Sequence, residues 1–208
     1  MLLQMAIDTA DLAGALALAE QTAEWVDIFE VGTPLLLRSG MQAVQALKAR
    51  FPHKRILADT KIVDAGALEC GDAVAAGADI VTVLAIADEA TVSEVTAAAH
   101  RAGRQVMADL IMVPDIPAAA QRMRALGVDY VCVHTGVDAQ KCGRTPLGDL
   151  KRLLTAVPPA CAAVAGGIRL ETAADYIALR PEIVIAGSAL TGAADPCAAA
   201  RQMKEAMG

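Results

Sequence analysis

A weak internal repeat constrains the fold of this chain more than any other feature. The segment Val26-Asp27-Ile28-Phe29-Glu30-Val31 resembles segments 78–83, 128–133 and 181–186, and the acidic second residue recurs at positions 27, 79, 129 and 182. Each segment is short, apolar and rich in β-branched residues, as buried strands are. Further aliphatic runs open the chain and separate these segments, at 2–7, 55–58, 105–110 and 162–165. The pattern therefore predicts eight strands.

Each predicted strand is followed by a stretch of helical composition, rich in Ala and Leu, of which 92–102 is the clearest. Gly77, Gly103 and Gly127 stand where helix C-caps belong, just before the fourth, fifth and sixth strands. Alternating strands and helices predict an α/β fold with a right-handed parallel sheet. We expect this sheet to close into a (β/α)8 TIM barrel, with residues 1–208 forming a single domain. An open doubly wound sheet is the alternative.

The composition of the chain argues against nucleic acid and membranes as binding partners. Hydrophobic residues make up 55% and aromatic residues 2%, so the core is aliphatic and many strands are expected to be buried on both faces. The net charge is −6 without any basic cluster, which argues against binding to nucleic acid. No apolar run is long enough for a membrane, no secretory signal is recognisable, and five scattered cysteines lack metal-finger spacing. We expect a cytoplasmic protein with reduced thiols.

Polar groups cluster where the predicted strands end, which is where barrels carry their chemistry. They are Asp8, Glu30, Asp59 with Lys61, Asp109, His134, Gly166-Gly167 and Gly187-Ser188. In the stretch Asp59-Thr60-Lys61-Ile62-Val63-Asp64, Asp59 and Lys61 point to the same side if the strand continues to Lys61. Two carboxylates flanking an amine can hold a divalent cation and keep a proton carrier beside it.

Most of these residues also have a structural interpretation. Asp8 is equally well explained as the cap of a following helix. Glu30 interrupts an apolar strand and therefore needs a partner. Lys61 forms either a structural ion pair with Asp59 or a group that transfers protons and stabilises an anion. A lone His is often structural, but the place of His134 at a strand end favours catalysis or substrate contact.

The two glycine-containing strand ends predict a phosphate site. Barrels often bind phosphate with the loops after strands 7 and 8, through backbone N–H groups. Gly166-Gly167 and Gly187-Ser188 end these two predicted strands, and glycine lets the backbone approach an anion closely. The pattern indicates a phosphorylated small-molecule substrate.

With these residues placed, the chain resembles the orotidine-monophosphate decarboxylase superfamily over nearly its whole length. The matching motifs are Glu30-Val31-Gly32-Thr33-Pro34, Asp59-x-Lys61-x-x-Asp64, His134-Thr135-Gly136-Val137-Asp138, Ala165-Gly166-Gly167-Ile168 and Gly187-Ser188-Ala189. Two branches of the superfamily are the most similar. One consists of aldolases that form 3-hexulose 6-phosphate, and the other of decarboxylases of 3-keto-L-gulonate 6-phosphate.

The resemblance implies a role for each residue. Glu30 and Asp59 would bind Mg²⁺, which would hold an enediolate formed from a sugar phosphate. The catalytic residues would be Lys61, Asp64, His134 and Asp109. The substrate would be bound by Asp8, Gly166, Gly167, Gly187 and Ser188. Members of the family are dimeric, so the resemblance also implies a homodimer in which Asp64 reaches into the partner's site.

The choice between the two branches depends on the residues after His134. The decarboxylase type carries an arginine three residues after the histidine and another near the phosphate, where this chain has Val137 and Ser188. Arg144 could reach back, but its spacing does not match. Both departures favour a Mg²⁺-dependent aldolase acting on D-ribulose 5-phosphate and formaldehyde. Decarboxylation of 3-keto-L-gulonate 6-phosphate is the alternative. A non-catalytic sugar-phosphate sensor is a third, disfavoured because binding alone does not need so many ionisable groups.

Overall fold

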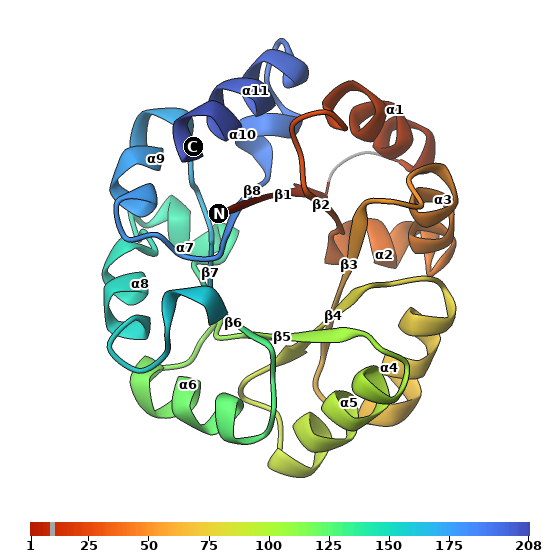
Figure 1. Cartoon of the computed structure of the whole chain (residues 1–208), viewed down its shortest axis with the longest axis vertical. Coiled ribbons are helices and arrows are strands. Elements are labelled where there is room, and N and C mark those ends of the chain that lie inside the picture. The colour runs from red at the N-terminus through yellow and green to blue at the C-terminus, as the bar shows by residue number, and fades with distance from the viewer. Residues whose placement is uncertain (9–10) are drawn as a thin grey trace.

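Eight parallel strands form a closed ring in the computed structural model, which describes residues 1–8 and 11–208 (Figure 1). The strands are β1 (Leu2–Ile7), β2 (Ile28–Val31), β3 (Arg55–Ile62), β4 (Ile80–Leu84), β5 (Gln105–Asp109), β6 (Tyr130–His134), β7 (Ala162–Ala165) and β8 (Ile183–Ala186). Because β1 pairs with both β2 and β8, the sheet has no edge. The predicted TIM barrel is therefore confirmed, and the open sheet is excluded.

Helices surround the ring of strands on all sides (Figure 1). They are α1 (Leu12–Thr22), α2 (Thr33–Ser39), α3 (Gln42–Arg50), α4 (Gly66–Ala75), α5 (Glu89–Arg101), α6 (Ile116–Ala125), α7 (Val137–Lys141), α8 (Leu147–Leu153), α9 (Leu170–Ile177), α10 (Ser188–Thr191) and α11 (Pro196–Met207), with a 3-10 turn at Pro159–Cys161. The expectation of one helix after each strand is wrong for β2, β6 and β8. After each of these strands, a short helix (α2, α7 or α10) precedes the longer one.

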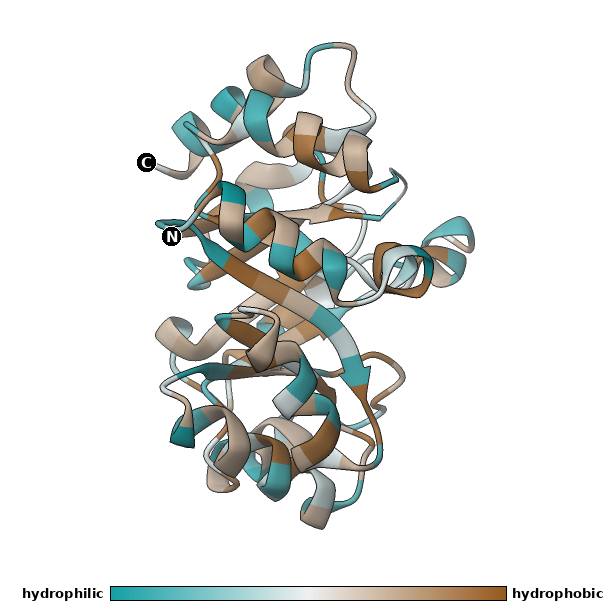
Figure 2. Cartoon of the chain, turned by 90° about the vertical axis from the view of Figure 1, so that its right-hand side faces the viewer, coloured by the Kyte–Doolittle hydropathy of each residue, from teal (hydrophilic) through white to brown (hydrophobic). Residues whose placement is uncertain are grey.

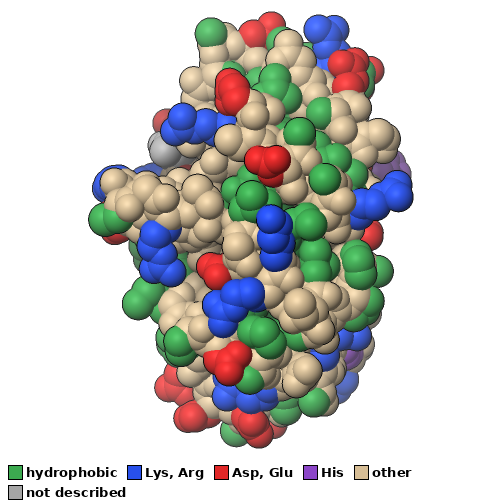
Figure 3. Space-filling model, turned by 90° about the vertical axis from the view of Figure 1, so that its left-hand side faces the viewer, with side chains coloured by type: hydrophobic (Ala, Val, Ile, Leu, Met, Phe, Trp, Pro, Cys, Tyr) green, Lys and Arg blue, Asp and Glu red, His purple; other side chains and the backbone are tan. Residues whose placement is uncertain are grey.

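The predicted helix ends before β4, β5 and β6 are confirmed. Gly77, Gly103 and Gly127 follow α4, α5 and α6 with φ of 101°, 68° and 84°, a left-handed conformation that glycine adopts without strain. None of the described helices is long and apolar enough to cross a membrane. On the face that Figure 3 shows, acidic, basic and hydrophobic side chains are interspersed.

The repeated acids lie just before the strands rather than within them. Asp27, Asp79 and Asp129 immediately precede β2, β4 and β6. Asp79 Oδ2 accepts a hydrogen bond from the backbone N–H of Ile56 at the start of β3, at 2.9 Å. The carboxylates of Asp27 and Asp129 accept equivalent bonds from β1 and β5, at 2.7 and 2.8 Å. The repeat thus reflects a strand-joining contact at the amino end of the barrel.

Side chains alternate between two apolar clusters along each strand, as strand geometry requires. In β3, Leu57 belongs to the cluster inside the barrel, whereas Ile56 and Ala58 pack in the larger cluster between strands and helices. In Figure 2 the front strand, β3, is hydrophobic in the part that follows its first residue and hydrophilic near its carboxyl end. Inward positions beyond the apolar filling therefore point polar groups into the carboxyl end of the barrel.

Candidate active site

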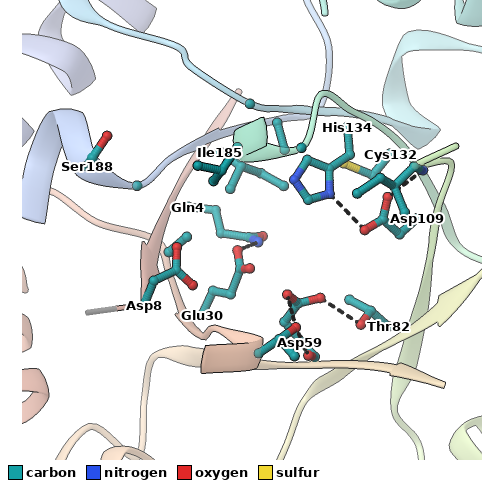
Figure 4. Close-up of a pocket in the computed structure, with 18 of the residues that line it drawn as sticks. Gln4, Asp8, Glu30, Asp59, Thr82, Asp109, Cys132, His134, Ile185 and Ser188 are labelled. Carbon is teal, nitrogen blue, oxygen red and sulfur yellow. Dashed lines mark hydrogen bonds and ion pairs between the residues drawn. The ribbon is translucent and has the colours of Figure 1, made fainter. Parts of the chain in front are cut away.

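The carboxyl end of the barrel contains a cavity of about 730 Å³, within the usual range for a small-molecule site (Figure 4). Ten of the eleven predicted site residues line it, namely Asp8, Glu30, Asp59, Lys61, Asp109, His134, Gly166, Gly167, Gly187 and Ser188. Asp64 does not line the cavity of its own chain. It is exposed, and its carboxylate accepts a hydrogen bond from the next backbone N–H, that of Ala65.

The alternation along the strands explains why these residues meet. Asp59 follows the inward Leu57 by two residues, and Glu30 follows the inward Ile28 in the same way. The end of β3 is irregular, because its register with β4 shifts between Ala58 and Ile62 and Lys61 has a φ of 49°. A left-handed conformation at a non-glycine residue stores strain, and such residues cluster at functional sites.

Asp59 is held by three side chains. Thr33 Oγ1 donates to Asp59 Oδ2 at 2.8 Å, and Thr82 Oγ1 donates to Oδ1 at 3.0 Å. The Lys61 ammonium forms an ion pair with Oδ2 and lies 3.6 Å from Asp109. Burial opposes the charge of Lys61, but the neighbouring carboxylates outweigh it and raise its pKa. The lysine is therefore protonated and aimed into a group of acids.

Glu30 is buried inside the barrel beside Gln4 (Figure 4). Gln4 Nε2 donates a hydrogen bond to Glu30 Oε2 at 2.5 Å. Burial and the nearby charge of Asp59 raise the pKa of Glu30 to about 8, against the opposing effect of that hydrogen bond. The positive charge of Lys61 is thus too weak to compensate Glu30, which makes this carboxyl group receptive to a cation.

His134 and Asp109 form a hydrogen-bonded pair on the opposite wall. His134 Nδ1 lies 2.8 Å from Asp109 Oδ2, and Asp109 Oδ1 accepts a bond from the N–H of Ile111 at 2.8 Å. Burial alone would lower the pKa of His134, but the hydrogen bond and charge of Asp109 raise it. Burial likewise opposes ionisation of Asp109, while His134 and Lys61 hold its pKa below the usual value. Asp109 orients the imidazole and favours its charged form.

Asp8 belongs to the cavity and is not a helix cap. The N-cap of α1 is Asp11, whose carboxylate accepts from the N–H of Gly14 at 2.8 Å. Burial and the charge of Asp59 raise the pKa of Asp8. A Cβ at Gly32 would lie 1.9 Å from Asp8 Oδ1, so a larger residue there would displace the Asp8 carboxylate from this position. The residues after Asp8, 9 and 10, lie outside the described part of the chain.

The loops after β7 and β8 line the same cavity with backbone. Gly166 has a φ of 110°, and a Cβ there would lie 2.3 Å from the carbonyl oxygen of Thr135. No other residue fits this position, so the loop packs directly on the end of β6. Gly187 and Ser188 begin α10 beside it. Arg169, two residues beyond Gly167, is exposed, lines the cavity and forms no ion pair within the described residues.

Several residues that line the cavity escaped the sequence interpretation. They are Gln4, Thr33, Arg38, Thr82, Cys132 and Arg169. The strand alternation would have found three of them, because Gln4, Thr82 and Cys132 occupy the same inward positions as the predicted residues. Thr33, Arg38 and Arg169 lie after the strands, where alternation no longer applies.

The oxygen atoms around Glu30 suit a hard divalent cation such as Mg²⁺. Glu30 and Asp59 offer carboxylate oxygens, and the buried Oε1 of Gln4 has no hydrogen-bond partner. Within residues 1–8 and 11–208, no three His, Cys, Asp or Glu side chains lie close enough to hold a metal by themselves. A cation here would therefore need water or substrate oxygens as further ligands, which is how Mg²⁺ usually binds.

Sequence comparison identifies the family. The model of the Orotidine 5'-phosphate decarboxylase / HUMPS family matches residues 1–203. The chain belongs to this family. The resemblance carried by the Asp59-x-Lys61-x-x-Asp64 motif is thereby confirmed, and the family match spans every residue predicted for the site.

Relatives within the Orotidine 5'-phosphate decarboxylase / HUMPS family share nearly the full length of the chain. The chain is 40% identical over 203 residues to 3-hexulose-6-phosphate synthase of Bacillus subtilis (strain 168), covering 98% of this chain and 97% of that protein. The crystal structure of 3-hexulose-6-phosphate synthase from Salmonella typhimurium matches with a TM-score of 0.97 at 44% identity, over 100% and 98% of the two chains. That of 3-keto-L-gulonate-6-phosphate decarboxylase from Vibrio cholerae matches at 0.86 and 29%, over 99% and 96%. The expectation of an enzyme of the lyase class is confirmed.

Proposed function

We propose that this enzyme is a Mg²⁺-dependent aldolase that condenses D-ribulose 5-phosphate with formaldehyde to give 3-hexulose 6-phosphate. The observation that carries the proposal is the meeting of Glu30, Asp59, Lys61 and His134 around one cavity, in a chain 40% identical to a 3-hexulose-6-phosphate synthase. The reaction would begin with loss of a C1 proton from the substrate to give an enediolate. The enediolate carbon would then form a bond to the formaldehyde carbon as the C=O π bond opens, and the resulting alkoxide would take up a proton.

Glu30 and Asp59 are the residues that would hold Mg²⁺. When bound, the cation would supply positive charge that stabilises the oxygens of the enediolate. Asp59 is fixed for this purpose by Thr33 and Thr82, so its carboxylate does not need to reorganise. The raised pKa of Glu30 fits a carboxylate that lacks a cationic partner in the protein alone.

Lys61 and His134 would act on the substrate directly. The Lys61 ammonium supplies a second positive charge where negative charge develops on oxygen. His134 is our candidate for proton transfer to or from the substrate, because Asp109 fixes its Nδ1 and leaves Nε2 as the other ring nitrogen for this role. Asp8 lines the cavity as a further contact for substrate hydroxyl groups.

The loops after β7 and β8 would bind the phosphate. Gly166, Gly167, Gly187 and Ser188 present backbone to the cavity, as phosphate sites of barrels do. Arg169 lies at the rim of the same loops and would add charge to this end of the cavity. A dianionic phosphate would then be bound by backbone N–H groups and Arg169, on a chain of net charge −6.

The alternative is decarboxylation of 3-keto-L-gulonate 6-phosphate through the same enediolate. Val137 lines the cavity at the start of α7, where the decarboxylase branch is expected to have an arginine that delivers a proton. Valine has no proton to give, so the aldolase is favoured. Parallel assays of formaldehyde consumption and carbon dioxide release with the purified protein separate the two reactions.

We also propose that the enzyme is a homodimer in which Asp64 contributes to the partner's site. Asp64 faces away from its own cavity, and large exposed hydrophobic side chains lie after β2, β3, β4 and β5, around the same end of the barrel. They are Leu37, Val63, Leu68, Ile86 and Met112.

Sedimentation analysis tests whether the protein is a dimer. Mixing an Asp64→Asn chain with an inactive Lys61→Ala chain tests the shared site, since mixed dimers should regain one active site.

The decisive experiment is an assay of ribulose 5-phosphate and formaldehyde with and without Mg²⁺. We expect turnover that is lost in EDTA and restored by added Mg²⁺. Undiminished activity in the chelator would contradict the metal role, and no turnover with these two substrates would contradict the proposed reaction.

Five cysteines without metal-finger spacing fit a reducing compartment, so we propose that the reaction takes place in the cytoplasm.

A further inference from the structure

Gln4 lies in the middle of β1, between the apolar residues Leu3 and Met5. Its side chain is fully buried, yet it lines the cavity beside Glu30 (Figure 4). The alternation of the strand places it on the same inward face as Ala6 and Asp8. An amide in this position interrupts the apolar interior of the barrel and therefore needs an explanation.

The two ends of the Gln4 amide differ in their contacts. Nε2 donates to Glu30 Oε2 at 2.5 Å, whereas Oε1 has no partner. Among the described residues, Oε1 is the single buried side-chain nitrogen or oxygen atom without a hydrogen bond. A buried acceptor left without a donor destabilises a protein by about 1–3 kcal/mol. A methionine or leucine would fill the space without this penalty, so the only contact through which the amide can stabilise the fold is its hydrogen bond to Glu30.

We infer that Gln4 is a positioning residue for the divalent cation of this site. Its Nε2 holds one oxygen of Glu30 and directs the other toward the cation, while its Oε1 accepts a hydrogen bond from a water molecule on the cation. The inference rests on the proposed metal-dependent function. Metal-binding carboxylates are commonly held by such neighbours, and loss of one lowers metal affinity about 10–100-fold.

The chemistry of the surroundings favours a hydrated cation over other occupants near Oε1. Glu30, Asp59 and Asp8 all line this part of the cavity, so an anion would be repelled. Oε1 can only accept a hydrogen bond, which excludes another acceptor as its partner. Mg²⁺ retains several of its water molecules when it binds to proteins, and such a water is a strong donor. One occupant thus satisfies both the carboxylates and the unpaired amide oxygen.

The test is calorimetric titration of Mg²⁺ into the substrate-free enzyme. Gln4→Met keeps the length of the side chain and removes both polar atoms, and Gln4→Leu repeats the test with a different shape. We expect both variants to bind Mg²⁺ about 10–100-fold more weakly than wild type. Their melting temperatures without Mg²⁺ should stay close to that of wild type, because removal of an unsatisfied buried oxygen offsets loss of the hydrogen bond to Glu30.

Gln105→Met is the matched control. Gln105 begins β5 at the opposite end of the barrel, where its Nε2 donates to the Tyr130 hydroxyl at 3.3 Å. This variant should bind Mg²⁺ as wild type does. If wild type binds Mg²⁺ and the Gln4 variants bind it equally tightly, the inference alone is overturned. If wild type binds no Mg²⁺, the proposed metal dependence is contradicted, and the inference about Gln4 falls with it. A large fall in melting temperature in both Gln4 variants would show that Gln4 serves the fold, and would also overturn the inference.

Discussion

At the amino end of the barrel, each of the three repeated aspartates has a basic side chain as its partner. Asp79 accepts hydrogen bonds from Lys48 at 2.8 Å and Arg104 at 2.5 Å, in addition to a backbone N–H. Asp27 pairs with Lys204 at 2.6 Å, and Asp129 lies 2.9 Å from the His100 ring. These acids join neighbouring strands, and lysine or arginine compensates the charges of Asp27 and Asp79 locally.

At the carboxyl end, the same residue types are present in excess. Asp8, Glu30, Asp59 and Asp109 all line the cavity around the ammonium of Lys61. The pKa values of Asp8 and Glu30 are raised, by burial first and by the charge of Asp59 second. Carboxylates that are buried with too few cations destabilise the protein alone. Acids at the amino end therefore stabilise the fold, whereas acids at the carboxyl end are suited to binding a cationic ligand.

Asp59→Asn should show the largest effect, because it removes a carboxylate from the end with excess charge. We expect activity to fall on the order of a hundred- to a thousandfold. Stability without metal should change little, because relief of the repulsion of Glu30 is offset by loss of the Lys61 ion pair. The single amide oxygen can keep only one of the two bonds from Thr33 and Thr82, which reach different carboxylate oxygens. Steady-state kinetics and thermal denaturation measure the two effects. Near-wild-type turnover would refute the role of Asp59.

Asp79→Asn, at the amino end, should lower stability and leave activity unchanged. Loss of the charge paired with Lys48 and Arg104 should lower the free energy of unfolding by about 2 kcal/mol. The turnover number should not change, because Asp79 is not among the residues that line the cavity. Urea denaturation and kinetics on the same preparation check this. A stable variant with impaired turnover would contradict the proposed division between the two ends.

Asp109→Asn should lower the pKa of His134, which the aspartate holds above 6.5. We expect activity near neutral pH to fall, because a smaller fraction of the His134 ring would carry a second proton. Titration of the His134 ring by NMR in both proteins measures the shift directly. An unchanged histidine pKa would show that Asp109 does not control its protonation.

The same pair predicts a dependence of stability on pH. The raised pKa of His134 stabilises the fold below 6.5, and this contribution is lost as pH rises through the raised value. The lowered pKa of Asp109 stabilises the fold above 3.8, and this contribution is lost as pH falls through the lowered value. The stability difference between wild type and Asp109→Asn should therefore be greatest between pH 3.8 and 6.5.

Arg169→Gln should have the smallest effect, because the side chain is exposed to solvent. We expect the KM for ribulose 5-phosphate to rise about fivefold, equivalent to about 1 kcal/mol for a surface ion pair, with kcat unchanged. Arg152→Gln is the control, since Arg152 is exposed but does not line the cavity. An equal change in both variants would indicate a general effect of protein charge instead of contact with the phosphate.

The sequence predicted the barrel well because its signals are local and repeated. Short aliphatic runs, helix-ending glycines and acids at fixed intervals specify strand, helix and turn without reference to distant contacts. The same signals missed α2, α7 and α10, which are too short for a clear periodic pattern. They also placed Asp27, Asp79 and Asp129 inside strands, because an acid that caps the neighbouring strand has no separate signature in the sequence.

The sequence by itself determined which polar residues end the strands, and therefore which chemistry the cavity can carry. Only the tertiary structure decided how those residues pair. Asp109 lies 25 positions before His134 and Gln4 lies 26 positions before Glu30, and barrel closure brings each pair into hydrogen-bond contact. Closure also decided which acids are compensated and which are not. Burial and the distance between charges set that balance, and both depend on contacts between strands that no local pattern contains.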